Sequence, residues 1–106
     1  MKEQMTTSNQ QEILRAKVNL ETAQMPWREM QRYFASGAAL FVSPDLDLVE
    51  TAYQMSADNA ALIGQWMADG QFGRVTDEQA RTWWDADALL WAVVVSPWVL
   101  VQPVTS

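Results

Sequence analysis

The C-terminal stretch of this chain, residues 88–106, carries no charged side chain, and most of it reads ALLWAVVVSPWVLV. It is too short for a membrane-spanning helix, which needs about 20 apolar residues, and Pro97 interrupts it. The β-branched run Val93–Val95 disfavours a helix, so we predict two strands, over 89–95 and 98–102. A hairpin at Ser96-Pro97, which in its tight two-residue form needs a cis peptide, and one bent strand both fit.

This stretch also predicts where the centre of the core lies, because a charge-free strand suits a sheet covered on both faces. Val94→Asp or Val95→Asp is then expected to unfold the domain. The residues expected to be among the least exposed are Trp91, Val93, Val95, Val99 and Val101.

Shorter elements precede these strands. The range 12–24 lacks Gly and Pro and is rich in strong helix formers, which predicts a helix. Thr76 and Gln79 have the spacing of a capping box and predict a helix over 77–85. Helical spacing and turn residues predict helices over 26–37, 45–57 and 58–70, and strands over 38–42 and 72–75. The fold class is therefore α+β, with a small sheet of about three to four strands packed by four to five helices.

The length of 106 residues is enough for one core and too short for two independently folding units. Apolar residues make up 49% of the chain and charged residues 19%, the balance of a folded globular protein. The polar N-terminus contains no apolar run that could act as a signal peptide. We expect a disordered leader over 1–10, a single α+β domain over 11–106 and a cytoplasmic protein.

Two residue types with versatile chemistry are missing, since the chain has no Cys and no His. The lack of Cys excludes disulfides, thiolate metal sites and cysteine nucleophiles. The lack of His removes the usual general acid and base near neutral pH and the commonest zinc and copper ligand. The net charge of −6 has the wrong sign for a phosphate backbone or an anionic membrane. We expect no cofactor, no nucleic acid partner and no membrane partner.

Acidic residues gather at two places. Asp45, Asp47 and Glu50 could ligate Mg²⁺ or Ca²⁺, but the segment lacks the glycine and remaining ligands of a calcium loop, and the first turn of a helix favours acids anyway. A second group flanks the 77–85 helix beside Trp83 and Trp84, where burial against Trp would raise a carboxyl pKa toward general-acid use. This second group consists of Asp77, Glu78, Asp85 and Asp87.

Cations and aromatic rings alternate in one short segment, where Arg28, Arg32 and Tyr33 follow Trp27. This mixture is typical of platforms that stack single-stranded nucleic acid. Two arginines on an acidic chain give that function little support, so we interpret them as residues of an exposed helix face.

Three strings in the sequence resemble a bacterial family known as domain of unknown function 2288. They are Leu20-Glu21-Thr22-Ala23 followed by Pro26-Trp27, then Asp45-Leu46-Asp47-Leu48-Val49-Glu50, and the C-terminal string from Leu90 to Gln102. The resemblance covers about residues 12 to 103, and its C-terminal string is specific. It implies a small, stand-alone, cytoplasmic bacterial protein and supplies no activity and no site residue.

Three features of the sequence predict that a second molecule buries part of this chain's surface. On the 12–24 helix, Leu14 and Val18 form a second apolar stripe, separate from the stripe of Ile13, Ala16, Leu20 and Ala23. The side chains of adjacent Trp83 and Trp84 point about 100° apart on a helix, so two separate surfaces are needed to bury both of them. Charge is polarised as well, with +1 over residues 1–32 and −7 over the remainder. We therefore predict a homodimer whose possible interface residues are Leu14, Val18, Trp83 and Trp84.

These observations favour a non-enzymatic protein-interaction or regulatory module, which binds a second copy of itself or another protein. The alternative is a small carboxylate-dependent hydrolase or lyase with an acid and Trp pocket. The two functions predict different arrangements of the acidic residues, because the enzyme requires acids that face inward in a closed pocket and the binding module does not.

Overall fold

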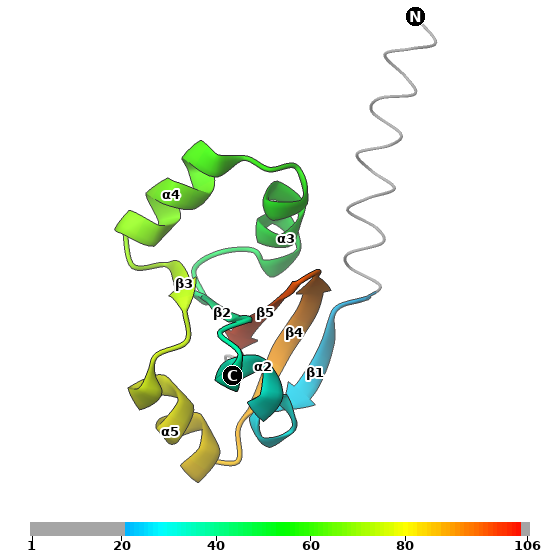
Figure 1. Cartoon of the computed structure of the whole chain (residues 1–106), viewed down its shortest axis with the longest axis vertical. Coiled ribbons are helices and arrows are strands. Elements are labelled where there is room, and N and C mark those ends of the chain that lie inside the picture. Colours follow the sequence, from blue (N-terminus) through cyan, green and yellow to red (C-terminus); the bar gives the residue numbers. More distant parts are fainter. Residues whose placement is uncertain (1–20, 105–106) are drawn as a thin grey trace, which may run out of the picture.

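A computed structural model describes residues 21–104 of the chain. Its five strands form one sheet in the order β1-β4-β5-β2-β3 (Figure 1). Neighbouring strands are antiparallel except β2 and β5, which are parallel. The strands are β1 (Ala23–Pro26), β2 (Ala39–Val42), β3 (Phe72–Arg74), β4 (Leu89–Val95) and β5 (Trp98–Pro103).

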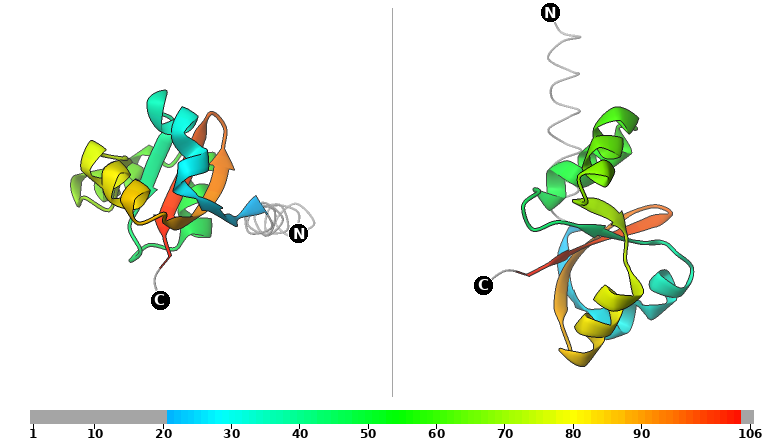
Figure 2. Two further views of the ribbon diagram at one scale, coloured as in Figure 1. Left: turned by 90° about the horizontal axis from the view of Figure 1, so that it is seen from below. Right: turned by 90° about the vertical axis from the view of Figure 1, so that its left-hand side faces the viewer.

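Helices lie on both faces of this sheet, with α3 and α4 on one side and α2 and α5 on the other (Figure 2). The helical elements within 21–104 are η1 (Trp27–Met30, a 3₁₀ helix), α2 (Gln31–Ala35), α3 (Leu48–Ser56), α4 (Ala60–Ala68) and α5 (Asp77–Asp85). The α+β class is confirmed. None of these helices has the length and apolar character needed to cross a membrane.

The sheet has five strands, one more than the upper end of the three to four strands that were predicted. Its additional member is β1, whose Ala23 and Gln24 were predicted to end the 12–24 helix. Their pairing with Ala92 and Trp91 outweighs the local helix propensity, because the ladder with β4 satisfies backbone groups that lie far apart in sequence. The rest of that predicted helix up to residue 20, and the leader expected over 1–10, lie outside the described residues.

Local sequence signals set most of the helix ends. The Asp47 side chain accepts a hydrogen bond from the Glu50 N–H, and Asn59 caps α4 in the same way. Thr76 and Gln79 form the predicted capping box of α5. Gly37 adopts φ +78° shortly after α2, a conformation that glycine reaches without a steric penalty.

The two C-terminal strands form a hairpin, since Val95 pairs with Trp98 in an antiparallel ladder. The Ser96–Pro97 peptide between them is cis. Of the two arrangements left open by the sequence, the bent strand is therefore wrong. The antiparallel ladder continues along the strands to the pair Leu90–Pro103.

The hydrophobic core lies in two clusters, one on each face of the sheet. Val93, Val99 and Val101 are at most 3% exposed, as predicted. Trp91 is 37% exposed and Val95 is only partly buried, so the expectation that they are among the least exposed residues is wrong for both. Val94 is 57% exposed, which removes the reason for expecting Val94→Asp to unfold the domain. Val93 shares a core cluster with residues of α3, whereas Trp91, on the same face of β4, is not among the residues of that cluster, and Val94 points to the opposite face.

Candidate functional site

The acids flanking α5 do not converge on one pocket: Asp77 and Glu78 line two different open pockets, and Glu78 shares its pocket with Trp83. All four of these side chains, Asp77, Glu78, Asp85 and Asp87, are exposed. Asp77 and Glu78 occupy the first helical turn, which the helix dipole favours. Asp87 has φ +49° directly after the helix, where an Asp tolerates the left-handed conformation that ends a helix. Their positions are thus explained by the start and end of α5.

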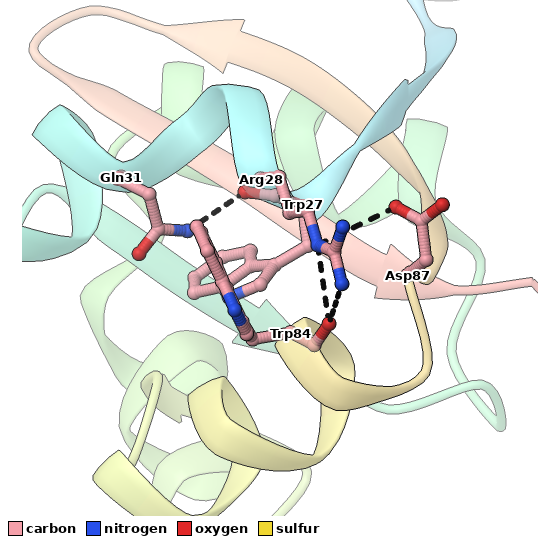
Figure 3. Close-up of polar contacts among 5 residues, drawn as sticks. All are labelled: Trp27, Arg28, Gln31, Trp84 and Asp87. Atoms are coloured by element: carbon pink, nitrogen blue, oxygen red, sulfur yellow. Dashed lines mark hydrogen bonds and ion pairs between the residues drawn. The ribbon is translucent and has the colours of Figure 1, made fainter.

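The adjacent tryptophans of α5 face different surroundings. Trp83 packs against the core, with its ring centroid 5.1 Å from that of Trp27 in an edge-to-face arrangement. Trp84 is 45% exposed, and the Arg28 guanidinium lies 5.1 Å from the centroid of its ring (Figure 3). The chain's own core therefore covers Trp83, while Trp84 stays accessible beside Arg28.

Arg28 joins η1 to the end of α5. Its Nε and Nη2 atoms donate to the Trp84 carbonyl at 3.2 and 2.9 Å, and its Nε lies 3.6 Å from an Asp87 carboxylate oxygen (Figure 3). A cation at a helix C-terminus is favoured by the helix dipole, and here it adds to the hydrogen bond that the Asp87 N–H donates to the Trp84 carbonyl at 3.1 Å. The exposed ion pair adds little, because solvent screens it. Arg28 therefore has a structural role that accounts for its position.

The segment with alternating cations and aromatic rings does not form a stacking platform. Trp27 is fully buried, and Arg32 lies over the ring of its neighbour Tyr33. Near α3, Asp47 is the N-cap and Asp45 precedes it, as the helix-start interpretation requires. No three Asp or Glu side chains in residues 21–104 gather closely enough to hold a metal ion.

An uncovered apolar strip lies on the sheet face that α3 and α4 share. Leu89 and Trp91 alternate with the buried residues of β4 and are 51% and 37% exposed. Pro26 lies opposite Leu89 on the neighbouring β1, which places it on the same face. We call Pro26, Leu89 and Trp91 the β4 strip. Exposed apolar side chains gathered on one face are typical of interaction surfaces.

The β4 strip continues into an open groove of about 330 Å³ beside the start of α3, which we call the α3 groove. Trp91 forms one side of this groove, and Leu46 and Val49 form the other. Thr22 also contributes to its lining, at the point where the described chain begins.

Gln102 holds the wall of the α3 groove in place. Its Nε2 donates to the Ser43 carbonyl at 2.9 Å and to the Leu46 carbonyl at 2.7 Å. These two bonds tie the loop before α3 to the sheet. Sequence reasoning did not single out Gln102, although a polar residue at the end of an otherwise apolar strand was the signal that could have found it.

The outer edge of the sheet beside the β4 strip offers little for strand addition. The Trp27 N–H donates to the Ala88 carbonyl at 2.9 Å and extends the ladder between β1 and β4. Alternation in an antiparallel ladder then turns the backbone of Gln24 and Pro26 outward, and Pro26 has no N–H to donate. The face of the sheet, rather than its edge, is the surface suited to a partner.

Comparisons with known proteins place this fold in a family. A family model described as protein of unknown function (DUF2288) matches residues 13–103. The chain belongs to the DUF2288 family. This confirms the resemblance drawn from the sequence strings. The chain is also similar to a solved protein, the NMR solution structure of PA1075 from Pseudomonas aeruginosa. The two share 39% identity with a TM-score of 0.78, over 89% of this chain and 87% of that chain. No curated protein matches.

The predicted interface residues thus fall into two groups. Leu14 and Val18 lie outside the described residues. Trp83 and Trp84 lie on α5, on the opposite side of the sheet from the β4 strip. The strip and the groove were missed at the sequence level, because Trp91 was assigned to the core.

Proposed function

We propose that this member of the DUF2288 family is a non-enzymatic protein-interaction module that forms a homodimer through the β4 strip. The observation that carries the proposal is the exposure of Leu89 and Trp91 on a sheet face that is otherwise packed under helices. An exposed tryptophan beside other apolar side chains is the kind of residue that dominates binding energy in interfaces.

The alternative of a carboxylate-dependent enzyme receives less support. It needs acids that face inward and are shielded from water, whereas the acids flanking α5 are exposed and hold positions explained by helix ends. The proposed setting is the bacterial cytoplasm, and the similarity to PA1075 of Pseudomonas aeruginosa supports the bacterial part of this proposal.

Sedimentation equilibrium of the full chain at micromolar concentration tests the proposal. We expect a mass near twice that of the 12.0 kDa chain. Trp91→Glu should weaken the dimer about tenfold or more, since truncating or charging a central aromatic costs more than about 1.4 kcal/mol of binding. The proposal is wrong if the mass stays at that of one chain across the concentration range.

Val94→Glu is the matched control. Val94 lies on the same strand and is 57% exposed, but its side chain points to the opposite face of the sheet. We expect this variant to dimerise like the wild type. Equal losses in Trp91→Glu and Val94→Glu, with both variants folded by circular dichroism, would show that added charge rather than the β4 strip controls association.

A further inference from the structure

We infer that the α3 groove of one copy receives residues 12–20 of the second copy, so that two chains exchange their N-terminal segments. This inference rests on the proposed homodimer and names the part of the partner that binds. It is argued from the position of the groove, the sequence of the segment and the charges on both.

The position of the groove relative to the chain start favours exchange between copies. Thr22 contributes to the groove lining, Glu21 has helical backbone, and β1 begins at Ala23. Only Thr22 therefore separates a helical residue from the strand, whereas connections between a helix and a strand that pack together usually need about 2–6 residues. So short a connection hinders the segment from folding back over its own groove. A second copy can present the segment without this restriction.

The sequence of the segment supplies an apolar stripe for the apolar side chains that line the groove. Leu14 and Val18 are four residues apart and share one side of the helix predicted for this range, which would be about 13 Å long over 12–20. Two aliphatic anchors at this spacing suit an open groove between a helix and a sheet, which is a common way for proteins to bind helical segments. The groove supplies Trp91, Leu46 and Val49 as apolar contacts.

The net charges of the segment and the groove are opposite: residues 12–20 sum to +1, with Arg15 and Lys17 against Glu12, and the groove lining contains Asp47. Arg15 and Lys17 flank the Leu14 and Val18 stripe, one on each side of the predicted helix. Asp45 and Asp47 stand exposed at the start of α3, and Asp47 lines the groove. Residues 21–104 as a whole contain four Arg against eleven Asp and Glu. The groove therefore attracts a basic segment, and the attraction fixes the orientation of the segment more than it adds affinity.

Cysteine pairing tests the exchange directly, because the natural chain contains no Cys and every disulfide formed comes from the introduced residues. Full-length Val18→Cys, labelled with ¹⁵N, is mixed with unlabelled full-length Val49→Cys under mild oxidation. We expect a covalent dimer whose mass contains one chain of each isotope. The control mixes Val18→Cys with Val94→Cys, which is exposed on the opposite face of the sheet, and we expect at least tenfold less of this dimer.

The other outcomes overturn the inference in distinguishable ways. If sedimentation shows a dimer but the Val49 and Val94 mixtures give equal yields, the proposed homodimer stands and the segment exchange is wrong. If the double variant Val18→Cys/Val49→Cys forms only a disulfide within one chain, the segment binds its own groove. If every variant sediments as one chain, both the homodimer and the exchange are wrong.

Discussion

Substitution of Gln102 tests whether its two hydrogen bonds stabilise the loop that forms a wall of the α3 groove. Gln102→Leu keeps the approximate size of the side chain and removes the donors to the Ser43 and Leu46 carbonyls, which lie 2.9 and 2.7 Å away. Each such bond contributes about 0.5–1.5 kcal/mol. The Ser43 carbonyl keeps a donor in the Leu46 N–H at 3.0 Å, whereas the Leu46 carbonyl loses the donor from Gln102, which adds a cost of similar size in a partly buried site. We therefore expect the free energy of unfolding to fall by about 2 kcal/mol.

Thermal and urea unfolding of the full chain measure this change. A loss of about 2 kcal/mol lowers the midpoint of a domain of this size by roughly 8–16 °C. Gln24→Leu is the matched control, because Gln24 and Gln102 lie opposite Trp91 on its two neighbouring strands. Gln24 is exposed, and its substitution should change the midpoint by a few degrees at most. Equal midpoints for the two variants would refute the reasoning, since the carbonyls would then need no donor from Gln102.

Two further predictions concern the core. Leu100→Ala, at a position with no exposed surface between β4 and β2, should cost about 3–5 kcal/mol in urea unfolding, whereas Leu89→Ala should cost less than about 1 kcal/mol because half of that side chain already contacts water. Val93→Asp should yield no cooperative unfolding transition and Val94→Asp should retain one by circular dichroism; the opposite order would mean that the faces of β4 are assigned wrongly.

The candidate surface shows where sequence reasoning stops. The run from Leu89 to Val95 predicts a strand, and the strand is present with these bounds. The same run does not tell which positions lie under a helix, because nearly every residue in it is apolar. Trp91 and Val93 point to the same face of β4, yet α3 covers only Val93. The prediction that Trp91 is buried was wrong because burial depends on where α3 crosses the sheet.

The features that could be predicted correctly from the sequence act over only a few residues of chain. The capping box at Thr76, the N-cap at Asp47 and the β-branched residues of β4 set the ends and type of their elements through contacts within one or two turns of chain. The tertiary structure alone decided that Ala23 belongs to a strand, which pairs with Ala92, and that Gln102 holds the loop before α3. These contacts join residues that lie far apart in the sequence, and their stability comes from pairing and burial that exist only once the sheet has formed.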